Sequence, residues 1–478
     1  MAAAGLLEGG AVCSIICMSR AFYSDWQLWT ALAQHEGRRG RTRLMYAAQA
    51  NNVARAWFLL DRGARVDSTS LRGESAMTLA CASGHAGAVR LLVDKAPEVA
   101  HLARVSDGTT PLIQAAERGR LDAVRCLVLD ARVDLNASTV HGVTALVGAS
   151  RGGHGAVVRF LTECTGIALN AATGKGDTAL ALACLEGHSA IVHCLAAAGA
   201  AVNTANANGK TPLMLAAHAR QDRIETISCL LLHGAAASIN AVSSAGETVL
   251  SRASASGSTG LIHVLVSHGA RVTGVGTVPL VAALCRGHSV AALSLIKYGA
   301  DCAAEGSASL LAAARLGFED VVRALLAGGA NCKAADAAGC TALHFAAAAG
   351  SAPVIDLLCA RGANCSAAAT GRVAAARVVP GTTPLMLASR SGSVKAVQAL
   401  GALGCDARVE DSEGRTALDY AKRSKMRRCI RALLEESESE SESESESESE
   451  SESESESESE SESESGSESG SESGSENE

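Results

Sequence analysis

A short phrase returns along this chain at nearly constant spacing: glycine, any residue, threonine or a substitute, any residue, then leucine. Successive copies lie 30 to 42 residues apart, and most steps are 33 to 35 residues. A period of this length indicates a stack of small units, each too small to bury a core alone. Such a stack offers an extended surface rather than a catalytic cleft. The clearest copies are Gly108–Leu112, Gly142–Leu146, Gly176–Leu180, Gly209–Leu213, Gly339–Leu343, Gly381–Leu385 and Gly414–Leu418.

The threonine of the phrase is predicted to begin a helix. Its hydroxyl can cap the first turn, and a proline at the next position fits the first helical residue. The leucine and a following Ala-Ala pair then share one face of that helix. A Gly-His turn, a second helix and a Gly-Ala stop follow in the better copies. The anchor positions are Thr42, Ser75, Thr110, Thr144, Thr178, Thr211, Thr248, Val278, Ala308, Thr341, Thr383 and Thr416.

These features resemble the ankyrin repeat, whose period is about 33 residues. The copy Thr341–Ala347 (TALHFAA) is close to the consensus of that family. The resemblance covers roughly residues 40–434 and implies an all-α solenoid of about twelve repeats. Each repeat would be a helix-turn-helix followed by a hairpin finger.

By the same resemblance, the expected function is protein–protein recognition by a non-catalytic scaffold or adaptor, acting as a monomer. Ankyrin contacts lie beside the Gly-x-Thr phrase and at the end of the first helix, on the concave face. The sequence does not identify the partner. The matching positions here are Leu71, Arg72, Glu74, Ser106, Asp107, Thr109, Glu117, Arg118, Lys175, Asp177, Asn208, Lys210 and His218.

The N-terminal segment, residues 1–39, is richer in aromatic residues than the rest of the chain. It resembles the second half of an F-box through Cys17, Arg20, Phe22, Leu28 and Trp29. An F-box would make the protein a substrate receptor of a cullin-type ubiquitin ligase, although the Leu-Pro first half is missing. The alternative is a helix that caps the open end of the first repeat. The candidate contacts to a ligase adaptor are Phe22, Trp26, Leu28 and Trp29.

The C-terminal segment, residues 435–478, alternates serine and glutamate. It has 20 Glu and no Lys or Arg, so it cannot bury a core and its charges repel one another. We expect a disordered tail that either keeps the protein soluble or regulates partner access. The serines resemble substrates of acidophilic casein-kinase-type enzymes, and the first candidate sites are Ser437, Ser439 and Ser441.

The charge of the chain is divided unevenly. There are 42 Lys and Arg against 50 Asp and Glu in total, and the tail holds 20 of the acids, which leaves 42 against 30 elsewhere. The basic end of the last repeat is interpreted as a solvated capping helix, a docking site for the tail, or a nucleic-acid contact. Nucleic acid is disfavoured because aromatic residues make up only 3% of the chain. The basic cluster comprises Lys422, Arg423, Lys425, Arg427, Arg428 and Arg431.

The chain lacks the motifs of catalysis and of cofactor binding. Gly174–Thr178 ends like a phosphate loop but has no upstream glycine, and no nucleophile elbow or kinase set occurs. Sixteen cysteines contain no CxxC pair and match no zinc module, so we expect core thiols and no metal site. We therefore predict a protein that is not an enzyme and has no cofactor. No apolar run is long enough for a membrane span, and a cytoplasmic location is expected, with the nucleus as a further compartment.

Overall fold

The computed structural model describes residues 40–217, 223–273, 278–303, 306–372 and 378–434. The described residues form helices joined by turns and loops, with isolated β-bridges but no named strand. The fold is therefore the all-α solenoid expected from the sequence. The chain divides into two compact units, Met1–Tyr298 and Gly299–Glu478. The predicted segments 1–39 and 435–478 lie outside the described residues.

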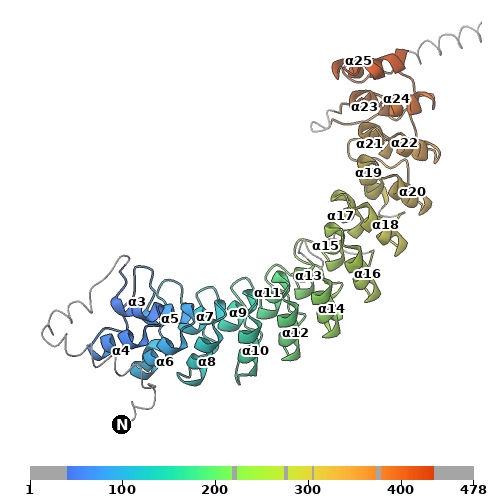
Figure 1. Ribbon diagram of the computed structural model, residues 1–478. Helices are drawn as coiled ribbons and strands as arrows, with labels where there is room; N and C mark the ends of the chain where they lie inside the picture. Colours follow the sequence, from blue (N-terminus) through green and yellow to red (C-terminus); the bar gives the residue numbers. More distant parts are fainter. Residues whose placement is uncertain (1–39, 218–222, 274–277, 304–305, 373–377, 435–478) are drawn as a thin grey trace, which may run out of the picture. The chain divides into compact units, whose positions relative to one another are not determined.

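In the first unit, each repeat contributes a first helix and a second helix, and the two kinds form two adjacent rows (Figure 1). The first helices are α3 Arg43–Gln49, α5 Ala76–Ser83, α7 Pro111–Glu117, α9 Ala145–Arg151, α11 Ala179–Glu186, α13 Pro212–Ala216, α15 Val249–Ser256 and α17 Pro279–Cys285. The second helices are α4 Val53–Asp61, α6 Ala86–Lys95, α8 Leu121–Leu129, α10 Gly155–Glu163, α12 Ser189–Ala197, α14 Ile224–Leu232, α16 Thr259–Ser267 and α18 Ser289–Lys297. Two 3-10 turns, η1 Pro97–Ala100 and η2 Ala235–Ser238, follow α6 and α14.

The second unit repeats the same pairing. Its first helices are α19 Gly306–Leu316, α21 Ala342–Ala349, α23 Pro384–Ser391 and α25 Ala417–Arg423. Its second helices are α20 Glu319–Ala327, α22 Ala352–Cys359 and α24 Val394–Gly401, and a last helix covers residues 427–434.

The anchor threonines start the first helices, as predicted. Every anchor except Ala308 is the N-cap of a first helix. The Thr178 hydroxyl, for example, accepts a hydrogen bond from the backbone N–H of Ala181 at 3.2 Å. Val278 caps α17 without a side-chain hydrogen bond. Ala308 lies inside α19. Alanine has no side-chain oxygen that could cap the first turn and so fix the start of the helix at that residue.

The two kinds of helix are buried differently. In α11, all six residues from Ala179 to Cys184 are buried, because neighbouring repeats and the repeat's own second helix surround it. In α12, only one face is buried, formed by Ile191, Val192 and Leu195. The alanine pairs of the first helices, such as Ala346-Ala347, are fully buried and allow the helices to approach closely. First helices therefore have few side chains to offer a ligand, and the exposed polar groups lie on the fingers and helix ends.

The fingers are joined to one another by main-chain hydrogen bonds. The N–H of Val140 donates to the carbonyl of Asp107 at 2.9 Å, and that of Gly174 donates to His141 at 2.8 Å. The next rung joins Ala207 to Lys175 at 3.0 Å. We call this series the finger ladder. It fixes the tips of these four fingers, from Asp107 to Ala207, relative to one another.

Candidate protein-binding surface

Several fingers are held in shape by one polar side chain at their start. The amide oxygen of Asn206 accepts hydrogen bonds from the backbone N–H groups of Asn208 and Lys210, each at 3.0 Å. The Thr139 hydroxyl has the same role with the second and fourth residues after it, at 3.3 and 3.1 Å. Such side chains replace a backbone partner in a turn. These side chains were not predicted from the sequence, because different residue types, such as asparagine and threonine, supply the oxygen in different fingers.

The structure places the predicted contact residues in two groups. One group is exposed on finger tips or at a helix end and comprises Leu71, Arg72, Ser106, Arg118, Lys175 and Asn208. The other group is half-buried and engaged with neighbouring repeats or with its own finger: Glu74, Asp107, Glu117, Asp177 and Lys210. Thr109 is buried, with 6% of its surface exposed, and offers little to a partner. His218 lies outside the described residues, as do the candidate adaptor contacts and the candidate phosphorylation sites.

The half-buried group connects successive repeats. Arg41 pairs with Glu74 at 2.6 Å, and Arg151 pairs with Glu117 at 3.2 Å. The carboxylate of Asp177 accepts a hydrogen bond from the Asn206 amide at 2.8 Å. These side chains stabilise the stack in addition to any contact with a partner.

A row of exposed apolar side chains crosses the first three fingers. Leu71, Val105 and Val140 are 84%, 95% and 70% exposed, and each stands at the tip of its finger. Exposed large apolar residues on three consecutive repeats offer an apolar surface for contact with another protein. Only Leu71 was predicted. The other two could have been found by comparing the residues before Gly108 and Gly142 with those before Gly73.

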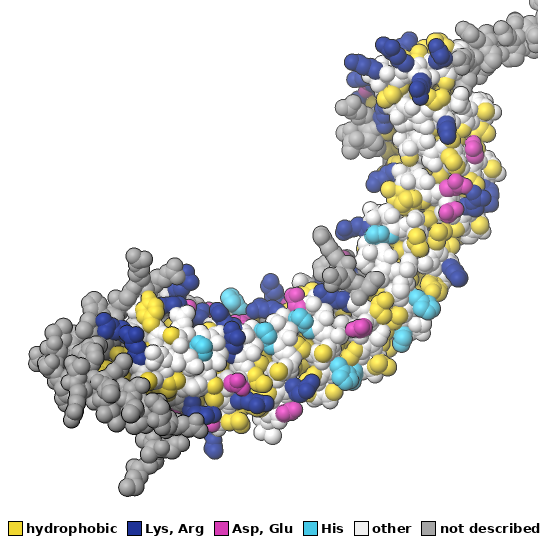
Figure 2. Space-filling model, viewed as in Figure 1, with side chains coloured by type: hydrophobic (Ala, Val, Ile, Leu, Met, Phe, Trp, Pro, Cys, Tyr) yellow, Lys and Arg dark blue, Asp and Glu magenta, His cyan; other side chains and the backbone are white. Residues whose placement is uncertain are grey.

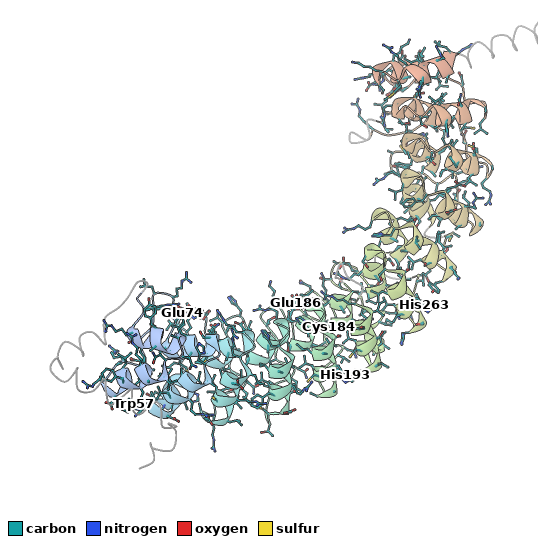
Figure 3. All side chains as sticks on the ribbon, viewed as in Figure 1. Trp57, Glu74, Cys184, Glu186, His193 and His263 are labelled. Carbon is teal, nitrogen blue, oxygen red and sulfur yellow. The ribbon has the colours of Figure 1, made fainter. Side chains whose placement is uncertain are left out.

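Next to this row is a hollow of about 180 Å³. The hollow lies on the finger side of the first unit, where Figure 3 labels its lining residue Glu74, and not on the second-helix side, where Trp57 and His193 are labelled. The walls of the hollow come from fingers and from the ends of first helices, and they bring the predicted Glu74 and Arg118 together with two further arginines. The polar lining residues are Arg41, Gln49, Glu74, Thr78, Ser83, Arg104, Gln114 and Arg118.

The hollow carries more positive than negative charge. Arg104 binds the Asp107 carboxylate at 3.1 Å and the Gln114 amide oxygen at 2.9 Å. Burial alone raises the pKa of Asp107, but hydrogen bonds from Thr109 and the charge of Arg104 outweigh burial and hold that pKa below its usual value. Arg118 makes no ion pair with any residue in the described ranges. Its guanidinium is free to bind a carboxylate from outside.

The histidines of the Gly-His turns connect repeats. His85, His154 and His188 are N-caps of second helices, as their place in the turn predicted. Their Nε2 atoms lie 3.0, 3.0 and 3.3 Å from the backbone carbonyls of Gln49, Glu117 and Arg151. Each carbonyl belongs to the last residue of the first helix in the preceding repeat. A carbonyl at the end of a helix has no hydrogen-bond partner inside that helix.

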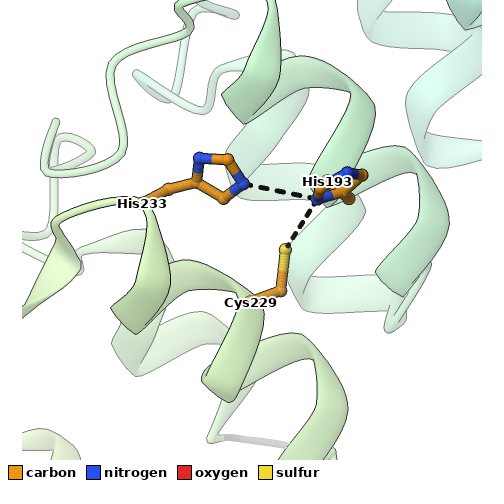
Figure 4. Close-up of side chains that lie close together, drawn as sticks. All are labelled: His193, Cys229 and His233. Carbon is orange, nitrogen blue, oxygen red and sulfur yellow. Dashed lines mark hydrogen bonds between the residues drawn. The ribbon is translucent and has the colours of Figure 1, made fainter.

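The cysteines differ in part from expectation. Cys126 is buried in its second helix, as predicted, whereas Cys194 and Cys229 are only half-buried. Second helices bury only one face, and the side chains of Cys194 and Cys229 lie near the edge of that buried face. Cys229 also lies beside His193 and His233, and the three donor atoms are within 4.8 Å of one another (Figure 4). The sequence did not predict this group.

Comparison with known families gives a match to "Ankyrin repeats (3 copies)" over residues 24–275, 280–369 and 372–444, in overlapping segments. Among solved structures, the chain is similar to the ankyrin repeat domain of human ASB11. The identity is 24%, the alignment covers 48% of this chain and 99% of that chain, and the TM-score is 0.43. No curated protein matches the chain. Within the described ranges, no helix is long and apolar enough to cross a membrane. The family match covers well over half of the sequence, and the chain belongs to the ankyrin-repeat family.

Proposed function

We propose that this chain is a non-catalytic scaffold or adaptor that binds a protein partner on the fingers of its first three repeats. Ankyrin repeats are in general non-enzymatic domains for protein–protein interaction. The observation that carries the proposal is the exposed row Leu71, Val105 and Val140 beside the arginine-lined hollow. At protein interfaces, arginine is among the residues that contribute most binding energy, and surrounding contacts exclude water from it.

The chemistry of the hollow specifies the partner. Arg41 and Arg104 are already paired with acidic residues, while Arg118 is free for a carboxylate. The polar amides of Gln49 and Gln114 have their oxygens engaged with Arg41 and Arg104, which leaves their N–H groups as donors. A peptide segment with an acidic side chain flanked by apolar ones fits this surface. The acid would enter the hollow and the apolar residues would cover the finger tips.

The test is an affinity pull-down with the full chain, read by mass spectrometry. A variant with Leu71→Asp, Val105→Asp and Val140→Asp should lose its specific partners, and Arg118→Glu should weaken each of them by about tenfold or more. The matched control is Val290→Asp, which alters a 66% exposed residue on a second helix. Partners retained by the triple variant at wild-type levels would contradict the proposed surface.

The same experiment addresses the ligase hypothesis. Recovery of an F-box adaptor and a cullin, lost when Phe22 and Trp26 are replaced by alanine, would identify a substrate receptor. Partners shared by both proteins, without ligase subunits, would leave the scaffold role.

The basic end of the last repeat supports a second, regulatory role. Figure 2 shows basic side chains gathered over α25 and the helix after it. All six residues of the basic cluster are exposed, and none forms an ion pair with a described residue. We propose that the acidic tail, which begins at Glu435, binds this cluster and competes there with acidic partners. Proteolytic removal of the tail should strengthen binding of a fluorescent polyglutamate peptide, most at low salt. Unchanged affinity and unchanged salt dependence would rule the role out.

A further inference from the structure

Three metal-binding side chains meet on the second-helix side of the first unit, away from the fingers. His193 lies on α12, Cys229 lies on α14, and His233 is the residue that ends α14. Nδ1 of His193 is 3.3 Å from Nε2 of His233 and 3.9 Å from Sγ of Cys229 (Figure 4). His193 is exposed, and the other two are half-buried.

The helical repeat produces this arrangement. Helices α12 and α14 are second helices of consecutive repeats and pack against each other. Cys229 and His233 are four residues apart, so they stand one turn apart on the same face of α14. His193 stands opposite both. His193 and Cys229 therefore come from packed helices, and His233 comes from the residue that directly follows α14.

The spacings fit a tetrahedral metal ion. Zinc binds nitrogen at about 2.0–2.1 Å and sulfur at about 2.3 Å. With tetrahedral angles, these bond lengths place two nitrogens about 3.3 Å apart, and a nitrogen and a sulfur about 3.6 Å apart. The nitrogen pair already has this separation, and the sulfur is a few tenths of an ångström too far. Closing the site requires the Cys229 and His233 side chains to rotate toward a common centre.

Hydrogen bonding alone does not satisfy the group. Nδ1 of His193 has either one N–H or one lone pair, yet it faces both a thiol and an imidazole. If Nδ1 of His193 forms a hydrogen bond with one of these two groups, the other has no partner between the three side chains. A cation between them would accept a lone pair from each of the three.

We propose that His193, Cys229 and His233 form a site for one Zn²⁺ ion that joins α12 to α14. Two imidazoles and a thiolate are ligands for zinc and its neighbours among the transition metals, and they exclude Mg²⁺ and Ca²⁺, which require oxygen ligands. The Cys229 thiol releases its proton to solvent when its sulfur binds the ion. Three protein ligands leave the fourth tetrahedral position to water or to a side chain of a bound partner.

The test uses the full chain, stripped of metal by a chelator and titrated with Co²⁺ and then Zn²⁺. Cobalt in a tetrahedral site gives visible absorption bands, and a cobalt–thiolate bond adds a near-ultraviolet band. The wild type should show both, and Zn²⁺ should abolish them by displacement. Cys229→Ala should lose the thiolate band. His193→Ala and His233→Ala should weaken the metal affinity by about 100-fold or more.

Two control variants separate this site from the other histidines and thiols. His268→Ala removes the histidine that ends α16, the position that matches His233 in the next repeat. Cys194→Ala removes a half-buried thiol beside His193. Both should bind Co²⁺ as the wild type does. Equal cobalt spectra and equal stoichiometry in the wild type and in Cys229→Ala would overturn the proposal. If Cys229→Ala fails to fold, Cys229→Ser provides the same comparison.

Discussion

Gly176, in one copy of the Gly-x-Thr phrase, is required for two separate reasons. Gly176 has a φ of +76°, a conformation that costs a residue with a Cβ about 1–2 kcal/mol. A Cβ at this position would also stand 2.7 Å from the backbone nitrogen of Ala207 in the next finger. Gly199, at the end of the second helix, has a φ of +90°, but a Cβ there would meet no atom within 4 Å. A substitution at Gly199 therefore tests backbone strain alone, and one at Gly176 tests backbone strain together with a steric clash.

Gly199→Ala should lower the free energy of unfolding by about 1 kcal/mol, and Gly176→Ala by about 2–4 kcal/mol. The additional loss in Gly176→Ala comes from displacement of the neighbouring finger. Urea denaturation followed by circular dichroism measures both. Equal losses of unfolding free energy in the two variants would show that the neighbouring finger can move away from the added Cβ without destabilising the protein.

A buried histidine makes one repeat sensitive to acid. His344 is fully buried on α21, where Nδ1 accepts a hydrogen bond from the Thr341 backbone N–H at 3.1 Å and Nε2 donates to the Thr382 carbonyl at 3.1 Å. Burial lowers the pKa of His344, against the opposing effects of the Thr382 carbonyl and the Asp336 carboxylate. The neutral ring is the form that fits these partners.

Because the folded pKa is below the unfolded value of about 6.5, the unfolded chain takes up the proton first. The stabilisation is complete above about pH 6.5 and is lost as the pH falls through the folded pKa. Hydrogen exchange of α21, corrected for intrinsic rates, should show reduced protection at about pH 5.5 relative to about pH 7.5. His344→Gln cannot be protonated and should show a smaller reduction. The same reduction in the variant would assign the effect to another group.

At the scale of the helix, the sequence predicted where each first helix begins, because a capping hydroxyl must stand at one fixed position. Ala308, which replaces the threonine and has no oxygen to place there, does not mark the start of its helix. The trio on α12 and α14 was missed for a different reason. His193 is 36 and 40 residues from its partners, and only the packing of two second helices shows which side chains face each other. A search for His and Cys on the facing sides of consecutive second helices would have found it.

Helix α17 lacks the side-chain cap that the preceding first helix, α15, has. Val278 occupies the N-cap position with extended backbone and no side-chain hydrogen bond. Val278→Thr should therefore stabilise α17 by about 1 kcal/mol. Hydrogen exchange of Pro279–Cys285 is the direct measurement, with Val278→Ala as the uncapped control. Equal protection in both variants would mean that the threonine hydroxyl does not reach the first turn.

At the scale of the whole molecule, charge is separated along the chain. Residues 435–478 hold 20 of the 50 acidic side chains and none of the 42 Lys and Arg. The candidate phosphorylation sites Ser437, Ser439 and Ser441 are the tail serines that are nearest in sequence to the basic cluster. Each phosphate would add about −1.5 to −2 charge.

Treatment with an acidophilic kinase should thus weaken binding of the polyglutamate peptide to the full chain. Replacing these three serines with alanine should remove more of that effect than replacing Ser459, Ser461 and Ser463, since attraction is screened with distance. Fluorescence anisotropy at low and high salt measures both. An effect that is the same for the two triple variants would show that only the total charge of the tail matters.

The finger ladder consists of main-chain atoms alone. No side chain at a tip takes part in the bonds from Asp107 to Val140, from His141 to Gly174, or from Lys175 to Ala207. The tip residues can thus be exchanged one by one while the frame that carries them stays in register. In evolutionary terms, specificity and foldability are separate traits in this protein: a duplicated copy could acquire a new partner through a few fingertip substitutions without first regaining its stability.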